Sequence, residues 1–211
     1  PSPFGIVGLS NSEEGDVDGE LREGYIRKFK EKPRPEEAFS NVINAGLYIL
    51  EPEVMALVPE GEKYDFSKNL FPRLLEMGWP MYAKAIDGVW FDVGSPTELI
   101  RAQHVLIEQR NTLPFPMPDG SVDGNGSFVS NAAVIGSNVE LHKSVIATGC
   151  SVGNQSTLLE TVLMEGASVG SNVSLSGCIL SPGAIVDDNV SAVDLVLGDG
   201  ECLNTNDNRL S

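Results

Sequence analysis

The sequence lacks a hydrophobic run long enough to cross a membrane, and its first residues have neither the basic flank nor the apolar core of a signal peptide. We therefore expect a cytoplasmic protein that does not act at a membrane. Cysteine is also scarce: there are three cysteines, none of them in a Cys-x-x-Cys motif. An odd number of scattered cysteines predicts reduced, partly buried thiols, here Cys150, Cys178 and Cys202, and argues against a disulfide framework.

Basic residues are few as well. Fourteen lysines and arginines stand against 30 acidic residues, which gives a formal net charge of −16. Such a charge repels nucleic acids and anionic membranes, and it requires any phosphate site to bring its own lysine, arginine or metal ion. The composition fits an ordinary acidic surface, and equally a halophile protein adapted to high cytoplasmic salt.

A repeat of 17 residues dominates the second half of the 211-residue chain, over residues 118–202. Three apolar columns recur at this spacing: Ile135, Val152, Val169 and Val186; Leu141, Leu158, Leu175 and Ala192; Ile146, Leu163, Leu180 and Leu197. A glycine column, Gly149, Gly166, Gly183 and Gly200, keeps the same spacing. Three apolar columns per repeat predict three short strands per coil, hence a three-sided parallel β-helix of about five coils. The glycines would form the tight corners.

A second apolar column adjoins the third inward one, at Phe128, Val145, Val162, Ile179 and Val196. Both columns cannot face inward in an alternating strand, so we expect an outer apolar stripe along the solenoid. We expect such a stripe to be covered either by the first domain or by another chain. The second alternative predicts a homo-oligomer assembled through the β-helix.

The first half reads as an α/β domain over residues 1–110. We expect strands at 25–30 and 41–50, the latter buried, and a strand pair at 82–86 and 89–93. Helices are expected from Asp65 to about Met77 and over 96–110, the second opened by a capping box at Ser95. A proline-rich linker (111–117) then leads to the β-helix (118–202), and a frayed tail (203–211) follows.

Several polar residues of this half could carry chemistry. Glu31 can accept hydrogen bonds from sugar hydroxyls, and Lys32 can hold a phosphate as a point charge. Asp92 stands among apolar residues before a glycine and a helix, where a carboxylate serves as a metal ligand or as a turn former. Singly, Glu31 and Lys32 are more often a solvated surface pair, and Asn44 could simply bond a neighbouring backbone group.

Together these stretches resemble the sugar-phosphate nucleotidyltransferases. The matching motifs are Phe4-Gly5, Phe29-x-Glu31-Lys32-Pro33, Asn44-Ala45-Gly46-x-Tyr48 and Trp90-x-Asp92-x-Gly94-Ser95-Pro96, followed by the β-helix. The subgroup looks like the mannose-1-phosphate guanylyltransferases and the glucose-1-phosphate thymidylyl- or uridylyltransferases. The resemblance implies an incomplete Rossmann-like domain followed by a left-handed β-helix, with sugar 1-phosphate and a nucleoside triphosphate as substrates. It also implies roles for individual residues: Gly5, Glu31, Asn44 and Gly46 bind the sugar, Lys32 holds its phosphate, and Asp92 binds catalytic Mg²⁺.

The chain departs from this family in one respect. It contains no glycine-rich loop of the kind that grips the nucleotide triphosphate, so we expect the 211 residues alone to be inactive. A non-catalytic assembly or regulatory subunit is the alternative. A β-helix acyltransferase with His142 as its base is the third interpretation, although the repeats are uninterrupted. His104, on the 96–110 helix, is expected to be a packing residue.

Overall fold

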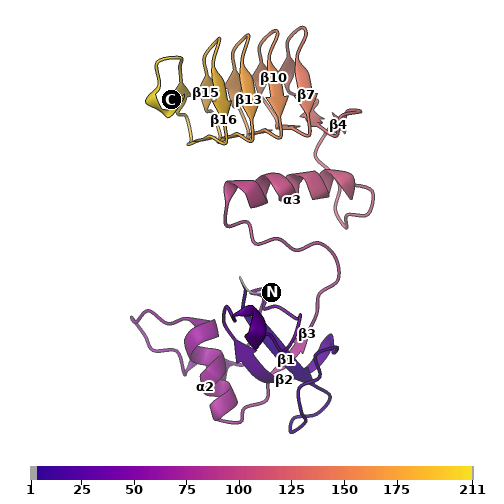
Figure 1. Cartoon of the computed structure of the whole chain (residues 1–211), viewed down its shortest axis with the longest axis vertical. Coiled ribbons are helices and arrows are strands. Elements are labelled where there is room, and N and C mark those ends of the chain that lie inside the picture. The colour runs from indigo at the N-terminus through magenta and orange to yellow at the C-terminus, as the bar shows by residue number, and fades with distance from the viewer. Residues whose placement is uncertain (1–3, 211) are drawn as a thin grey trace. The chain divides into compact units, whose positions relative to one another are not determined.

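The computed structural model describes residues 4–210 and divides the chain into two compact units, one ending at Trp90 and one beginning at Phe91. Each unit has its own strands and its own hydrophobic core, and Figure 1 labels the elements of both. No helix among the described residues is long and apolar enough to cross a membrane.

The first unit is built on a three-stranded antiparallel sheet of order β1-β2-β3. Its strands are β1 (Ile6–Ser10), β2 (Glu23–Lys30) and β3 (Tyr82–Lys84). The strand predicted at 25–30 is therefore present, the one predicted at 82–86 is shorter, and residues 89–93 form none. The edge of β1 that does not face β2 is bonded to residues 42–44. The Val7 amide donates to the Val42 carbonyl at 2.9 Å, and the Asn44 amide donates to the Gly5 carbonyl at 2.8 Å.

Four short helices complete the described part of the first unit. They are η1 (Pro35–Glu37), α1 (Pro52–Met55), η2 (Phe66–Leu70) and α2 (Phe71–Glu76), and α2 packs against β2. The helix predicted from Asp65 is confirmed as η2 and α2, because the Asp65 carboxylate accepts the Lys68 amide at 3.0 Å and Gly78 follows with a φ of 69°. Leu70, Phe71 and Leu74 form the core of the unit, with Phe29 of β2 packed against them.

The strand predicted over residues 41–50 is wrong for most of its length. Only Ile43 forms a bridge to β1, and the segment then continues without regular pairing. Leu47 is 80% exposed and Ile49 is fully exposed, although both were expected in the core. The physical reason is that a strand needs a neighbour for its backbone, and none of the described residues supplies one beyond Asn44.

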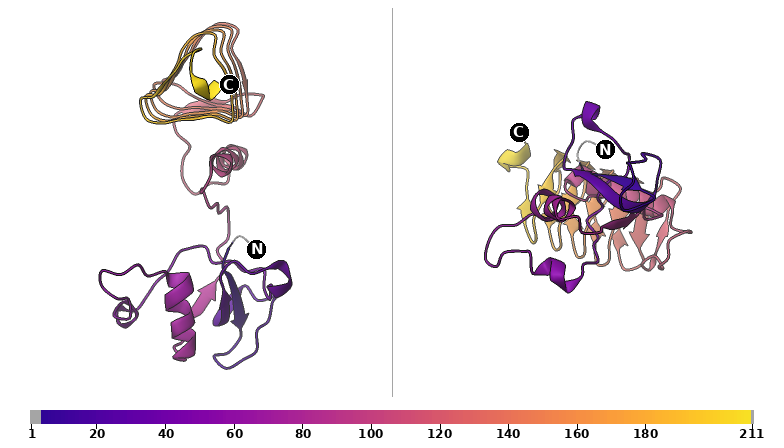
Figure 2. Two further views of the ribbon diagram at one scale, coloured as in Figure 1. Left: turned by 60° about the vertical axis from the view of Figure 1, so that its left-hand side comes forward. Right: turned by 90° about the horizontal axis from the view of Figure 1, so that it is seen from below.

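The second unit contains the predicted β-helix. Its parallel strands are β5 (Phe128–Ser130), β6 (Val134–Ile135), β7 (Glu140–His142), β8 (Val145–Ile146), β9 (Ser151–Val152), β10 (Thr157–Leu159), β11 (Val162–Leu163), β12 (Ser168–Val169), β13 (Ser174–Ser176), β14 (Ile179–Leu180), β15 (Ile185–Val186), β16 (Ser191–Val193), β17 (Val196–Leu197) and β18 (Cys202–Leu203). Leu158 pairs with Leu141 and Leu175, so neighbouring strands are offset by the repeat (175 − 158 = 17). Four coils are complete and β17 and β18 begin a fifth; viewed along the axis, the coils form a triangle (Figure 2).

The predicted columns form one continuous core inside these coils. Ile146, Leu163 and Leu197 are fully buried, and Leu180 is nearly so. The four corner glycines have φ between 66° and 72°, where a side chain is strained. Ile135 differs from the prediction: it lies in the first coil and is 36% exposed, because a terminal coil is covered on one side only.

Helix α3 (Pro96–Glu108) covers the outer apolar stripe. The Ser95 hydroxyl caps it by accepting the Glu98 amide at 3.2 Å. Ile100 packs on Val162 and Ile179 of the stripe, and all three side chains are at least 92% buried. The stripe is thus covered at its centre by the helix that was assigned to the first domain, while Val196 remains 43% exposed. Burial of each such side chain contributes roughly 1.5–3 kcal/mol.

Both ends of the solenoid are closed by other segments. Strand β4 (Gly120–Val122) pairs antiparallel with β5 at the first coil. At the last coil, Leu203 is fully buried in β18, and Arg209 of η3 (Asn208–Leu210) donates to the Glu201 carboxylate at 3.0 Å and the Cys202 carbonyl at 3.3 Å. We predicted from the sequence that residues 203–211 form a frayed tail. Of these, Ser211 lies outside the described residues.

The three cysteines are free thiols. Cys150 and Cys178 belong to the solenoid core, whereas Cys202 is exposed on β18. Desolvation by this burial raises the pKa of the Cys150 and Cys178 thiols.

Candidate functional site

Three of the predicted sugar-binding residues meet at the beginning of β1. Gly5 precedes β1, Glu31 follows the end of β2, and Asn44 follows the bridge at Ile43. A methyl group on Gly5 would lie 2.6 Å from the Glu31 Oε2 atom, so only glycine allows this approach without a shift. On the other side, the Gly5 carbonyl accepts the Asn44 amide at 2.8 Å. Residues far apart in sequence therefore converge here through antiparallel pairing.

Lys32 lies beside this group in an unusual backbone conformation. Its amide donates to the Phe4 carbonyl at 3.2 Å, and its φ is 45°, in the left-handed region. Pro33 should favour an extended backbone at Lys32, so the observed conformation differs from the one predicted. A non-glycine residue in this region costs about 1–3 kcal/mol and is often found at functional sites.

Lys30 and Arg34, which flank Lys32 in the sequence, form ion pairs, whereas the Lys32 ammonium forms none with a described residue. Lys30 contacts Glu37 at 2.8 Å, and Arg34 contacts the same carboxylate at 3.1 Å. The Arg34 guanidinium and then the Lys30 ammonium hold the pKa of Glu37 at about 2. Neither the Lys32 ammonium nor the Glu31 carboxylate forms an ion pair with any other residue within 4–210. Both are therefore available to a ligand.

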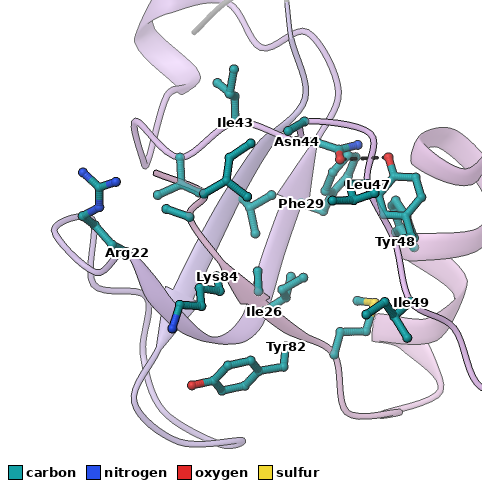
Figure 3. Close-up of a pocket in the computed structure, with 18 of the residues that line it drawn as sticks. Arg22, Ile26, Phe29, Ile43, Asn44, Leu47, Tyr48, Ile49, Tyr82 and Lys84 are labelled. Atoms are coloured by element: carbon teal, nitrogen blue, oxygen red, sulfur yellow. Dashed lines mark hydrogen bonds between the residues drawn. The ribbon is translucent and has the colours of Figure 1, made fainter. Parts of the chain in front are cut away.

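The side chain of Asn44 is held by three hydrogen bonds. Its Oδ1 accepts the Tyr48 hydroxyl at 2.8 Å, the bond dashed in Figure 3, and the Gly46 amide at 3.2 Å. Its Nδ2 donates to the Ser67 hydroxyl at 3.2 Å. Both acceptor positions of Oδ1 are occupied. The second Nδ2 hydrogen of Asn44 is therefore the group that can still donate a hydrogen bond to a ligand. Tyr48 and Ser67 were not among the site residues predicted from the sequence. Tyr48 belongs to the quoted motif, but no sequence signal points to Ser67.

Gly46 and Asp92 are the two remaining residues of the predicted site. Gly46 is exposed, has a φ of 79°, and would meet nothing within 4 Å if it carried a Cβ. It makes the turn that returns its amide to Asn44. Asp92 belongs to the second unit, where the Arg101 guanidinium lies 5.6 Å from the Phe91 ring centroid and the Gly94 amide donates to the Asp92 carbonyl at 2.8 Å. Its neighbour Trp90 belongs to the first unit and donates to the Ala45 carbonyl at 3.2 Å.

Potential metal ligands do not cluster among the described residues. Within residues 4–210, no three histidine, cysteine or acidic side chains gather in a group that could hold a metal ion. The Asp92 carboxylate is exposed and forms no hydrogen bond or ion pair with another described residue. Because Mg²⁺ is often held by one or two carboxylates together with substrate phosphates, a lone free carboxylate fits as one ligand and not as a complete site.

An apolar trough of about 970 Å³ lies next to the candidate sugar site. Its floor includes Ile26 and Phe29 of β2, and its walls include Leu47, Ile49 and Tyr82 (Figure 3). Of the predicted site residues, Asn44 alone lines it. Arg22 and Lys84 also line the trough. The predicted polar groups gather instead at Gly5, Glu31, Lys32 and Asn44, where we place the candidate sugar site.

The two histidines have different surroundings. His142 is exposed on β7, opposite Leu159 of β10, and its ring forms no hydrogen bond or ion pair with another described residue. A general base needs a neighbour to orient it, so nothing in its surroundings favours an acyltransferase site. The Nε2 atom of His104 lies 2.6 Å from the Lys143 carbonyl, which fastens α3 to the solenoid as a packing residue would.

Residues 1–109 match the nucleotidyl transferase family, and residues 119–195 match the GlmU-like C-terminal hexapeptide family. The chain belongs to the nucleotidyl transferase family. The second match and the parallel coils are consistent with the left-handed β-helix expected from the sequence.

Several curated proteins are similar to this chain. UTP–glucose-1-phosphate uridylyltransferase of Synechocystis is 49% identical over 71 residues, which are 34% of this chain and 18% of the relative. Glucose-1-phosphate adenylyltransferase of Clostridioides difficile is 34% identical over 129 residues (58% and 33%). The catalytic subunit beta of mannose-1-phosphate guanylyltransferase from Danio rerio is 31% identical over 139 residues (65% and 35%). The chain thus matches about a third or less of the length of each.

Among solved structures, a mutant GDP-perosamine N-acetyl transferase from Caulobacter crescentus aligns with 40% of this chain and 49% of its own. The TM-score is 0.32 and the sequence identity is 18%. A likeness of this size supports no conclusion about function.

Proposed function

We propose that this chain supplies the sugar-phosphate side of a sugar-1-phosphate nucleotidyltransferase. The observation that carries the proposal is the convergence of Gly5, Glu31, Lys32 and Asn44 from three separate segments. The relatives named above act on glucose 1-phosphate or mannose 1-phosphate by name, and we take these two sugars as the first substrates to test.

The chemistry would follow from positioning and charge. A phosphate oxygen of the sugar 1-phosphate attacks the α-phosphorus of the nucleoside triphosphate, the bond from that phosphorus to the bridging oxygen breaks, and pyrophosphate leaves. The Lys32 ammonium would hold the sugar phosphate, and the Glu31 carboxylate would accept hydrogen bonds from sugar hydroxyls. The remaining Nδ2 hydrogen of Asn44 would bind an acceptor oxygen of the sugar or its phosphate.

Asp92 would be one ligand of Mg²⁺, and the nucleotide phosphates, waters and residues outside this chain would provide the others. When bound, Mg²⁺ neutralises charge on the reacting phosphates. The contribution of this chain is a free carboxylate on a segment fastened to α3 through Phe91 and Arg101. Divalent metal is typical of the family, while the identity of the ion for this chain is part of the proposal.

The test uses the chain completed by a nucleotide-binding half, for which we choose the part of the Synechocystis relative that precedes its matched segment. Pyrophosphate release from glucose 1-phosphate and UTP is measured. Asp92→Asn should nearly abolish turnover, with partial recovery at high Mg²⁺. Lys32→Ala should mainly raise the KM for the sugar phosphate, which Mg²⁺ cannot restore.

Matched controls lie nearby. Asp87→Asn removes an exposed carboxylate that pairs with Arg22 at the surface, and Arg27→Ala removes an exposed base of β2, so both should leave turnover unchanged. The isolated 211-residue chain should release no pyrophosphate. Activity of the isolated chain, or full activity of Asp92→Asn in the completed enzyme, would overturn these assignments.

A non-catalytic assembly subunit is the second candidate. It is favoured by the β-helix, which would serve for association and leaves Val193 and Val196 68% and 43% exposed. A completed enzyme that binds sugar 1-phosphate and yet releases no pyrophosphate would favour this candidate over the first.

A further inference from the structure

The hydroxyl of Ser67 lies beside the atom of Asn44 that can still bind a ligand. The Asn44 Nδ2 atom donates one of its two hydrogens to the Ser67 Oγ atom at 3.2 Å. Ser67 is half-buried in the first turn of η2, whereas Asn44 follows the bridge to β1. This hydrogen bond therefore joins η2 to the candidate sugar site across 23 residues of sequence.

The orientation of the Asn44 amide follows from its other two partners. The Gly46 amide lies 3.2 Å from the Oδ1 atom and can only donate, so the atom that faces it is the oxygen. The Tyr48 hydroxyl donates to the same oxygen at 2.8 Å (Figure 3), and the Tyr48 ring is held by its edge contact with the Phe71 ring, at 5.0 Å between centroids. The nitrogen of the amide is thus turned toward Ser67, and the Ser67 hydroxyl accepts from it.

The hydroxyl hydrogen of Ser67 remains to be donated. A serine hydroxyl carries one hydrogen besides its acceptor lone pairs, and no residue within 4–210 accepts this one. Hydrogen bonds in a chain polarise one another, so the bond accepted from Asn44 strengthens the Ser67 hydroxyl as a donor. Asn44 and Ser67 together offer two adjacent neutral donors, one N–H and one O–H, whose heavy atoms are 3.2 Å apart.

The other groups of the site indicate what this donor pair would bind. A phosphate is better served by the charged Lys32 ammonium than by neutral donors. The Glu31 carboxylate can only accept, so it can take the hydrogens of sugar hydroxyls but cannot bond to their oxygens. Two neutral donors side by side complement Glu31, because they suit the oxygens of two hydroxyls on neighbouring sugar carbons.

We propose that Ser67 is a specificity-determining residue of the sugar site. Its hydroxyl donates to one hydroxyl oxygen of the sugar, and the remaining Nδ2 hydrogen of Asn44 donates to the oxygen of the neighbouring hydroxyl. This inference rests on the proposed function for the identity of the ligand, and it adds a contact from a residue outside the sequence motifs. A sugar that lacks one of these two hydroxyls loses a hydrogen bond and leaves a donor of the site without its acceptor.

The test measures binding by the 211-residue chain, in the absence of a nucleoside triphosphate. Titration calorimetry compares the unaltered chain with Ser67→Ala, using glucose 1-phosphate or mannose 1-phosphate, whichever binds more tightly, and the monodeoxy analogues of that sugar. Ser67→Ala should weaken binding of the complete sugar phosphate about tenfold. One analogue should bind about tenfold more weakly to the unaltered chain and lose nothing further with Ser67→Ala, because the hydroxyl that it lacks is the partner of Ser67.

Two further variants separate this contact from a loss of structure. Ser67→Thr keeps the hydroxyl and should bind within about threefold of the unaltered chain. Ser12→Ala removes an exposed hydroxyl beyond the other end of β1 and should bind as the unaltered chain does. A merely structural role of Ser67 would weaken the binding of every analogue to the same extent, and that result would overturn the proposal. Unchanged affinity of Ser67→Ala would overturn it as well.

The two proposals fail in different ways. Binding of a sugar 1-phosphate that depends on Lys32 but not on Ser67 keeps the sugar site and refutes the Ser67 contact. Failure of the unaltered chain to bind either sugar phosphate refutes the sugar site, and the Ser67 contact with it.

Discussion

Replacing Leu163 by alanine tests the shared core of the solenoid. Leu163 is fully buried on β11 and belongs to the same core as Cys150 and Cys178. Truncating a buried leucine to alanine costs about 2–5 kcal/mol, from lost transfer free energy and from the cavity left behind. A cost of about 3 kcal/mol raises the population of the opened coils about a hundredfold, since 1.4 kcal/mol corresponds to a factor of ten.

Thiol reactivity reports this opening selectively. The exposed Cys202 should react at once with a chromogenic aromatic disulfide, whereas Cys150 and Cys178 can react only when the coils open. Leu163→Ala should therefore speed the reaction of the two buried thiols by about a hundredfold. Fluorescence of Trp79 and Trp90 reports the first unit, which ends at Trp90, and should not change.

The control is Ile185→Ala on β15, a strand in another sheet of the solenoid, where the residue is 44% exposed. Nearly half of Ile185 is already in water, so its truncation should alter the thiol rates much less than Leu163→Ala does. Equal acceleration by both variants, or none by Leu163→Ala, would refute the assignment of Leu163 to a shared core.

Three further predictions concern charge and assembly. With 30 acidic and 14 basic residues, the Tm should rise from low to molar KCl as self-repulsion is screened, and a flat or falling Tm would remove the halophile interpretation. The Arg209 guanidinium holds the pKa of Asp207 at about 2, so this contact stabilises the last coil above the ordinary carboxyl pKa and is lost as the pH falls through about 2. An NMR titration should find that midpoint, and Arg209→Ala should raise it toward the ordinary carboxyl value, although the backbone amide of residue 209 would still donate to Asp207. A midpoint that does not change in Arg209→Ala would contradict the pairing. Homo-oligomerisation through the β-helix stays a prediction, now resting on exposed aliphatic residues of the last coils such as Val196; light scattering that shows a monomer at micromolar concentration would remove it.

The solenoid could be predicted from sequence because its contacts repeat with the sequence. Leu141, Leu158 and Leu175 pair directly across neighbouring coils, so one spacing determines the register of every strand. The cover of the outer stripe could not be predicted in the same way. Whether Val162 meets α3 or another chain depends on where the linker carries the helix, and no periodicity encodes that.

The candidate site shows a similar division. The motifs identified Gly5, Glu31 and Lys32 in advance, and antiparallel pairing explains why they meet. The left-handed conformation of Lys32 was missed because the local preference set by Pro33 points the other way. Residues 41–50 were predicted as a buried strand because their apolar pattern is correct for one, but a strand also requires a neighbour, which a local pattern does not reveal.

The most direct test of the sugar-phosphate site is an NMR titration of the 211-residue chain itself with glucose 1-phosphate and with mannose 1-phosphate. We predict that at least one of them saturably shifts the amide resonances of Lys32 and Asn44. Lys32→Ala should weaken that binding at least tenfold, while Arg27→Ala should not, and inorganic phosphate alone should bind less tightly than the sugar phosphate. Resonances that do not move with either sugar phosphate, or binding that survives in Lys32→Ala, would contradict the central claim.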